Sequence, residues 1–310
     1  MKFKAVIIVL MSLLFLSETE AQNIQGSGFN LDVLYPGQEG KKMYFGQYWR
    51  GSTYARDSVI ISSAGKAVFK SKEKYPEGQY FIHIAPDFRA DLLIGNEQSK
   101  IQIIVNNKDY FKSTISGSND TKLLWDYMSM VTESENIIET LNDQLSDSKT
   151  TSQKKANIEK EIAKEEEIVQ THVADLIKNN KNSWFGTFLK GMTSINLPYP
   201  NPKNEKEFVD NKNFGKTHYF DNINLTDPRL WRTNYMASYI DTYLRQWVDP
   251  IPDSLAIAAS NLVGKTKVDE ACFKEMLSYL VNMSTTSDRM GDENIWAKLC
   301  EEYIFDKKLS

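Results

Sequence analysis

The chain has 310 residues, with 37 lysines and arginines against 41 aspartates and glutamates and a formal net charge of −4. This mildly acidic balance argues against nucleic-acid binding, because a protein that binds a polyanion needs a clustered basic face that releases counterions from phosphates. We therefore expect no nucleic-acid partner. The 41% hydrophobic content is ample for packed cores, and the length is compatible with two domains.

Residues 1–21 have the composition of a secretory signal peptide. A basic start is followed by an apolar run over residues 5–16, and the small residues Thr19 and Ala21 fit the rule for a cleavage site. A membrane-spanning helix needs about 20 apolar residues, and this run is shorter. We expect export across the inner membrane to the periplasm, a mature chain that begins at Gln22, and no membrane span after the leader is cleaved.

Residues 22–118 consist of short runs of β-branched and aromatic residues separated by turn residues. The clearest runs are residues 42–49, 57–61, 67–69, 79–84, 91–94 and 101–105. Turn-forming segments such as Pro36-Gly37 lie between them. Short strands at this spacing are typical of an antiparallel sandwich or barrel. We predict an antiparallel β-sandwich domain over residues 22–118.

From residue 119 the hydrophobic period changes to that of helices. Asn119 or Asp120 can accept the free amide protons of a first helical turn, and apolar residues then recur three or four positions apart as far as Leu145. A polar break at residues 146–152 precedes a second stretch with the same period. These two segments predict a long antiparallel helical hairpin, and the mixed charges of the second favour a solvated face.

The remainder is predicted to be helical, with one long connection. Residues 197–216 contain three prolines and are expected to form a mobile surface loop. The expected helices are residues 184–189, a helix from Pro228 to Trp247 capped by Asp227, a helix from Asp253 that closes at Gly264, residues 268–282, and residues 294–304 started by Asp292. The predicted fold class is α+β, with a β-sandwich followed by an all-α helical domain at residues 119–310.

The chain contains two cysteines, Cys272 and Cys300, which lie on separate predicted helices. Each falls within an amphipathic pattern, which favours buried, unreactive thiols. A structural disulfide between them is the second interpretation. Redox catalysis is the third, because an active thiol needs a partner or a setting that lowers its pKa, and neither is evident nearby.

His83, His172 and His218 occur singly, without the His-x-x-x-His or Cys-x-x-Cys spacing that places ligands around a metal. The sequence also lacks a Gly-x-Ser-x-Gly elbow, a phosphate loop and a dinucleotide fingerprint. A glycosidase needs two carboxylates that face each other across a cleft, and abundance of Asp and Glu alone does not provide them. We assign no catalytic, cofactor-binding or metal-binding residue and expect no cofactor.

An aromatic-rich stretch spans residues 219–247. Its rings could line a groove for a peptide or a glycan, but their spacing favours a helix core. The residues concerned are Tyr219, Phe220, Trp231, Tyr235, Tyr239, Tyr243 and Trp247.

Several short motifs occur in a fixed order along the chain. They are Asp57-Ser58-Val59, Gly65-Lys66-Ala67-Val68-Phe69, Pro76-Glu77-Gly78-Gln79-Tyr80, Ile115-Ser116-Gly117-Ser118-Asn119-Asp120, His218-Tyr219-Phe220-Asp221-Asn222-Ile223, Asp227-Pro228-Arg229-Leu230 and Asp288-Arg289-Met290-Gly291. The first four resemble the N-terminal β module of thioredoxin-like, thiol-disulfide oxidoreductase proteins of the bacterial cell envelope. The last three look like the helical domain of unknown function that follows it in many members.

The resemblance implies a thioredoxin-like domain, with its Cys-x-x-Cys pair, after a helix similar to residues 294–304. This sequence ends at Ser310, so we expect that domain to be missing, either because the protein has lost it or because it is encoded downstream. The function expected is that of a secreted, non-catalytic accessory protein that binds a protein or peptide partner. Alternatives are a truncated part of a thiol-disulfide oxidoreductase and a glycan- or peptide-binding envelope protein.

Overall fold

A computed structural model gives the fold and describes residues 28–86 and 88–305. The expected leader at residues 1–21 lies outside these residues. The strands are β1 (Phe29–Leu34), β2 (Lys42–Trp49), β3 (Ser52–Ile60), β4 (Lys66–Ser71), β5 (Gly78–Ile84), β6 (Phe88–Ile94), β7 (Ile101–Ile104) and β8 (Thr114–Ser116), with the short helix η1 (Tyr110–Lys112) before β8.

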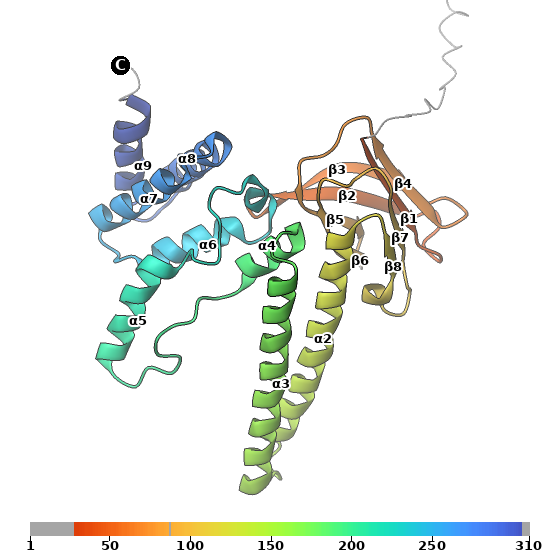
Figure 1. Ribbon diagram of the computed structural model, residues 1–310, viewed down its shortest axis with the longest axis horizontal. Helices are drawn as coiled ribbons and strands as arrows, with labels where there is room; N and C mark the ends of the chain where they lie inside the picture. Colours follow the sequence, from red (N-terminus) through yellow and green to blue (C-terminus); the bar gives the residue numbers. More distant parts are fainter. Residues whose placement is uncertain (1–27, 87, 306–310) are drawn as a thin grey trace, which may run out of the picture.

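The helices follow the last strand. They are α2 (Asn119–Ser146), α3 (Ser152–Asn179), α4 (Trp184–Met192), α5 (Glu205–His218), η2 (Pro228–Arg232), α6 (Met236–Thr242), η3 (Tyr243–Trp247), α7 (Pro252–Thr266), α8 (Glu270–Thr285), α9 (Glu293–Cys300) and η4 (Glu301–Phe305). Helices α2 and α3 form a long hairpin that projects away from the sheets, while α5 to α9 gather on the other side of α4 (Figure 1). Within residues 28–86 and 88–305, no helix combines the length and apolarity that crossing a bilayer requires.

The strands form two four-stranded sheets, in the orders β4-β1-β7-β8 and β3-β2-β5-β6. The expected antiparallel pairing is wrong in one place, because β1 and β7 run parallel. The two strands are separated by the whole of the second sheet, so the chain can return to the same end of β1 before it forms β7. A tight hairpin allows only antiparallel neighbours, whereas a long crossover of this kind allows parallel ones.

Side chains from both sheets meet in one aromatic core. Phe29 of β1 stacks on Phe45 of β2 with ring centroids 5.0 Å apart. Phe45 in turn lies 5.6 Å from Phe69 of β4 and 5.3 Å from Tyr80 of β5. All four rings are buried. Because strand residues alternate between faces, one face of each sheet supplies this core.

The helical region is fastened directly to the second sheet. Arg50, which follows β2, donates its backbone N–H to the Trp231 carbonyl at 2.9 Å, and its guanidinium pairs with Glu275 of α8 at 2.6 Å. Trp184 of α4 donates its indole N–H to the Gly78 carbonyl at 3.3 Å. One continuous cluster of buried apolar residues therefore includes both the strands and the helices.

The expected start of the first long helix is corrected by the capping contacts. Ser118, and not Asn119 or Asp120, caps α2, because its Oγ accepts the Thr121 N–H at 3.3 Å. Asp120 instead accepts the backbone N–H of Phe185 at 2.9 Å and so positions the start of α4. A hydroxyl at the N-cap satisfies one of the otherwise free amide protons of the first turn.

The mobile loop expected at residues 197–216 is wrong in its second half, where α5 forms. Asn204 caps this helix by accepting the Glu207 N–H at 3.1 Å, and the Glu207 carboxylate accepts the Lys203 N–H at 2.6 Å. The contacts resemble a capping box, except that Glu207 accepts the amide proton of the residue before the cap and not that of the cap itself. The prolines lie before the cap, so they do not interrupt the helix.

The single helix expected from Pro228 to Trp247 is divided. The segment η2 ends at Arg232 and is capped by Thr233, whose hydroxyl donates to the Leu230 carbonyl at 2.6 Å and accepts the Met236 N–H at 3.3 Å. This competing side-chain bonding lets the chain turn before α6 begins. Helix α7 also differs from expectation, because it continues through Gly264 and ends at Thr266.

Candidate functional site

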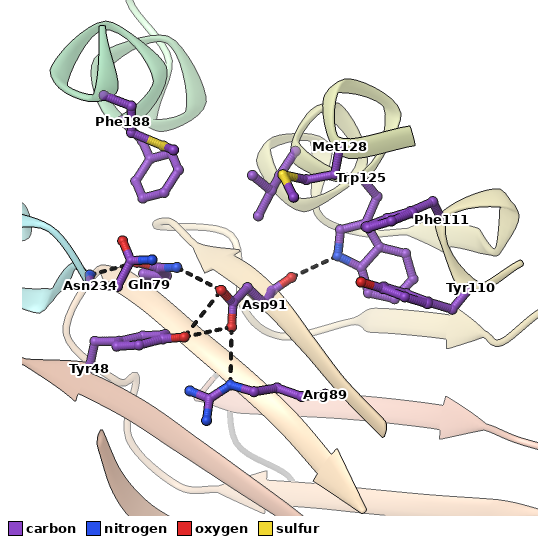
Figure 2. Close-up of a pocket in the computed structure, with 12 residues that line it drawn as sticks. Tyr48, Gln79, Arg89, Asp91, Tyr110, Phe111, Trp125, Met128, Phe188 and Asn234 are labelled. Atoms are coloured by element: carbon purple, nitrogen blue, oxygen red, sulfur yellow. Dashed lines mark hydrogen bonds and ion pairs between the residues drawn. The ribbon is translucent and has the colours of Figure 1, made fainter. Parts of the chain in front are cut away.

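A cavity of about 350 Å³ lies between the second sheet and the helices α2 and α4 (Figure 2). The sheet contributes Tyr48, Gln79, Arg89 and Asp91. The opposite walls include Tyr110, Phe111, Trp125, Met128 and Phe188. The site therefore combines polar side chains on the sheet with an aromatic and thioether surface facing them.

Strand alternation and register bring the polar residues together. Arg89 and Asp91 are two positions apart on β6 and so point to the same face. Phe81 of β5 pairs directly with Asp91, and Gln79, two residues earlier on the same strand, shares that face. The buried neighbours that alternate with them, such as Leu92, point into the core between the sheets.

Helix α2 covers this face of the sheet because its N-cap residue and two residues of its first turns bond to β6. The indole N–H of Trp125 donates to the Asp91 carbonyl at 2.7 Å. The hydroxyls of Ser118 and Thr121 donate to the Leu93 carbonyl at 3.3 and 3.0 Å. These contacts hold α2 over the polar side chains of the sheet and so close one side of the cavity.

The Asp91 carboxylate is the centre of the site. It accepts the Tyr48 hydroxyl at 3.0 Å on Oδ1 and the Gln79 Nε2 at 2.9 Å on Oδ2. The Arg89 Nε lies 3.7 Å from Oδ1, close enough for attraction but too far for a hydrogen bond. Figure 2 shows these three side chains converging on Asp91. A carboxylate has about four lone-pair directions, so acceptor capacity is left for a ligand.

Burial raises the pKa of the Asp91 carboxyl above its ordinary value of 3.8, against the opposing effects of the Tyr48 hydrogen bond and the Arg89 charge. The side chain keeps 31% of its surface accessible, so the carboxyl is partly buried and still open to a ligand from the cavity. Burial, followed by the charge of Asp91, raises the pKa of Tyr48 to about 12. Tyr48 is therefore a neutral phenol that donates its proton to the carboxylate.

Arg89 is held mainly by aromatic rings. Its guanidinium carbon lies 3.9 Å from the centroid of the Phe81 ring and 5.2 Å from that of Tyr48. A guanidinium over a ring face is attracted by the ring quadrupole. The arrangement holds Arg89 beside Asp91 without the bidentate pairing that would neutralise the carboxylate fully.

Comparison of the chain with protein-family models, with curated proteins and with solved structures gave no match.

The two cysteines are free thiols and are not bonded to each other. Cys272 on α8 is fully buried, and burial, reinforced by the nearby Asp269 carboxylate, raises the pKa of its thiol to about 12. A thiol in this setting is a poor nucleophile, because the thiolate is the reactive form. Cys300 at the end of α9 is half-buried.

The three histidines lie apart. His83 faces the Phe88 carbonyl at 2.7 Å, His218 contacts the Asp221 carboxylate at 2.8 Å, and His172 is exposed on α3. In the part of the chain that the structure describes, no group of three or more His, Cys, Asp or Glu side chains could hold a metal ion.

The aromatic stretch at residues 219–247 packs inside the helical region. Tyr219, Phe220 and Trp231 are buried, and the remaining four rings lie half-buried against the core. Tyr219 lies 4.7 Å from Tyr239 and 5.8 Å from Trp247 between ring centroids. These rings stabilise helix packing, as their spacing predicted, and none of them lines the Asp91 cavity.

Sequence reasoning missed Asp91 and its partners. The alternation of Arg89 and Asp91 with apolar residues in β6 is the pattern of a strand with one solvent-facing side. The additional signal was the run of aromatic residues at Tyr110, Phe111 and Trp125, which supplies a covering surface close in sequence.

Proposed function

We propose that this protein is a non-catalytic binding protein of the cell envelope, which takes a basic side chain of a protein or peptide partner into the Asp91 cavity. The observation that carries the proposal is the setting of Asp91. Its carboxylate is partly buried, and the one cation near it among the described residues, Arg89, is beyond hydrogen-bond distance at 3.7 Å. A cationic ligand would supply the charge-assisted hydrogen bond that the carboxylate lacks.

The walls of the cavity suit the same ligand. A lysine or arginine side chain has an apolar stem and a charged end. The stem would lie against Trp125, Met128 and Phe188, and the charged end would reach Asp91. Aromatic faces attract cations in their own right. A volume of about 350 Å³ is at the small end of ligand sites, which fits one side chain better than a whole cofactor.

The architecture proposed for this function is an antiparallel β-sandwich at residues 22–118 followed by an all-α domain at residues 119–310. The aromatic core between Phe29 and Phe45 supports the sandwich, since it joins the inner faces of the two sheets. The order of the helices after Ser116 supports the second domain.

The envelope location is proposed from the leader and from the resemblance to thioredoxin-like proteins. N-terminal sequencing of the secreted protein tests the location, and a first residue of Gln22 is expected. An insulin-reduction assay tests the non-catalytic role. No turnover is expected from the purified mature protein, whereas robust reduction that Cys272→Ser or Cys300→Ser abolishes would favour a complete oxidoreductase.

The binding proposal is tested by calorimetric titration with two blocked tripeptides, acetyl-Ala-Lys-Ala-amide and the uncharged acetyl-Ala-norleucine-Ala-amide, whose side chain is the butyl stem of lysine without its ammonium group. The lysine peptide is expected to bind at least tenfold more tightly. Asp91→Asn should remove that difference, because the amide keeps the shape but not the charge. Asp143→Asn is the matched control, since Asp143 is exposed on α2 and does not line the cavity. Equal binding of both peptides to the native protein would contradict the proposal.

A further inference from the structure

A second cavity, of about 400 Å³, lies on the opposite face of the sheet that carries Asp91. It is lined by Gln47, Trp49, Tyr54, Arg56 and Arg232. Gln47 and Trp49 flank Tyr48 on β2, and Tyr48 lines the Asp91 cavity. Because successive side chains of a strand point to opposite faces, the two cavities are separated by the thickness of the sheet.

Register explains how the strand residues meet. Tyr54 of β3 pairs with Gln47 of β2, so their side chains share a face. The register then shifts between Phe45 and Gly46, which pair with Asp57 and Ala55 and leave Arg56 as the extra residue of a β-bulge. Bulges redirect side chains and are frequent beside functional sites. Here the Arg56 Nη2 donates to the Gln47 Oε1 at 2.7 Å, which holds the guanidinium at the rim of the cavity.

Arg232 comes from the helical region and forms the inner wall. Its guanidinium carbon lies 4.7 Å from the centroid of the Trp49 ring, and its Nη1 donates weakly to the Pro228 carbonyl at 3.4 Å. Burial lowers the pKa of Arg232 below its ordinary value, and the nearby positive charge of Arg56 acts in the same direction. Glu275 attracts Arg232 from a distance, but its carboxylate is bound to Arg50 at 2.6 Å.

Three other arginines each have the carboxylate partner that Arg56 and Arg232 lack among the residues described. Arg50, Arg229 and Arg245 each have a carboxylate oxygen at 2.6 Å. Arg56 and Arg232 form no ion pair with any residue in the described ranges, although acidic residues outnumber basic ones in the chain by 41 to 37. Two guanidinium groups thus share one cavity with donors to spare and no anion.

We propose that this cavity binds an organic oxyanion, with its phosphate or carboxylate group between Arg56 and Arg232 and its ring against Trp49 and Tyr54. Guanidinium groups match the planar and tetrahedral oxygen arrangements of carboxylates and phosphates through paired N–H donors. Tyr54 is 49% exposed, which leaves its ring free to contact a ligand. This anion site is separate from the Asp91 cavity. The Asp91 cavity suits a cation instead.

The probe is phenyl phosphate, compared with benzoate, inorganic phosphate and phenol in calorimetric titrations of the mature protein. Phenyl phosphate and benzoate distinguish the two anion types. At least one of them should bind saturably and at least tenfold more tightly than inorganic phosphate. Phenol should bind at least tenfold more weakly than that ring-bearing anion. Absence of binding by both ring-bearing anions at millimolar concentration overturns the proposal, and equal affinity for inorganic phosphate overturns the ring contact.

Substitutions of single arginines test whether the ligand binds in this cavity. Arg56→Gln should weaken binding at least tenfold, and because Arg56 is exposed at the rim this change leaves the fold intact. Arg232→Gln should do the same, with circular dichroism as a check on folding. Arg289→Gln is the matched control, since Arg289 is exposed and outside the cavity. Unchanged affinity in Arg56→Gln refutes the site, whereas unchanged affinity in Asp91→Asn is expected and separates this inference from the proposed function.

Discussion

The Oε1 atom of Gln79 accepts the backbone N–H of Asn234 at 2.9 Å, across 155 residues of sequence. The Nε2 atom of the same side chain donates to the Asp91 carboxylate at 2.9 Å. Gln79 is 2% exposed, so both ends of one amide are satisfied within the protein. Gln79 thereby links the sheet side of the Asp91 cavity to the helical region. A substitution of Gln79 is expected to affect both.

Gln79→Glu is expected to destabilise the protein in a pH-dependent way. The substitution would place a second carboxyl oxygen about where Nε2 now lies, 2.9 Å from Asp91 Oδ2. Two carboxylates this close cannot both ionise, so the pair keeps a proton and one pKa is raised. A raised folded-state pKa gives stability that is present at low pH and is lost as pH rises, by about 1.4 kcal/mol for each pKa unit.

Urea unfolding at several pH values between 4 and 8 measures this effect. Gln79→Met is the control, because it removes both hydrogen bonds without adding a carboxyl and should show a much flatter pH dependence. A Gln79→Glu curve parallel to the Gln79→Met curve would mean that the two side chains do not meet as described.

The native Asp91 carboxyl should itself give a measurable pH dependence. Its folded-state pKa is raised above 3.8 by burial. Its contribution to stability is therefore fully present below the unfolded-state pKa and is lost as pH rises through the folded-state value. The unfolding free energy of the native protein minus that of Asp91→Asn should fall across this window and level off above it. Tyr48→Phe should widen the window, because the Tyr48 hydrogen bond lowers the pKa of Asp91. A difference that stays constant from pH 3 to 7 contradicts the raised pKa.

Local patterns predicted the long hairpin well, because each of its helices has its own periodic apolar positions and a polar break between them. The same reasoning missed α5, although Asn204 and Glu207 have the spacing of a capping box. The prolines at 198, 200 and 202 dominated that interpretation, and they in fact precede the cap. The cap residues therefore predict the start of α5 better than the prolines predict a loop.

The candidate site could not be predicted from local sequence patterns, because it depends on tertiary packing. Arg89 and Asp91 occupy alternate positions of a strand, as residues on a solvent-facing side do. Only the packing of α2 over that face, through Trp125, turns an ordinary polar face into a cavity with a partly buried carboxylate. The contact of Gln79 with Asn234 depends on the whole fold, so no window of sequence contains it.

Gly215→Ala tests the packing of the helix that the sequence did not predict. In a free helix this change stabilises by about 1 kcal/mol, because alanine has the better helix propensity. Here a Cβ atom at Gly215 would overlap the Cε3 atom of Trp247. Overpacking costs about 1–3 kcal/mol, so net destabilisation is expected. In a Trp247→Leu background the same change should become neutral or stabilising. Thermal unfolding of the four proteins measures this, and a stabilising Gly215→Ala in the native background contradicts the contact.

Arg245 and Asp292 form a buried pair that should dominate the stability of the last helices. The Arg245 Nη1 and Nη2 donate to the two carboxylate oxygens at 2.8 and 2.6 Å, and the Asp292 side chain is 1% exposed. Arg245→Leu leaves a buried charge without its partner and should cost about 3–5 kcal/mol near pH 7. Lys206→Leu, which breaks an exposed pair with Asp210, should change stability little.

The pair also has a predicted pH signature. The Arg245 hydrogen bond lowers the pKa of Asp292, so the contribution of this group to stability is present above the unfolded-state pKa and is lost as pH falls through the folded-state value. The cost of Arg245→Leu should therefore shrink as the solution is acidified toward pH 3. A cost that grows on acidification would show that the carboxylate is not stabilised by Arg245.

Cys272 should be inert in the folded protein. With a pKa of about 12, roughly one thiol in 10⁵ is ionised at pH 7, and the side chain is fully buried as well. Ellman's reagent should label Cys272 only as fast as the protein unfolds, which can be followed in a Cys300→Ala variant so that a single thiol is counted. Urea above the unfolding midpoint should restore rapid labelling. Fast labelling of native Cys300→Ala, or a disulfide between Cys272 and Cys300 in the purified native protein, would contradict the buried thiol. Fast labelling would favour the redox alternative, whereas a disulfide would favour a structural bridge.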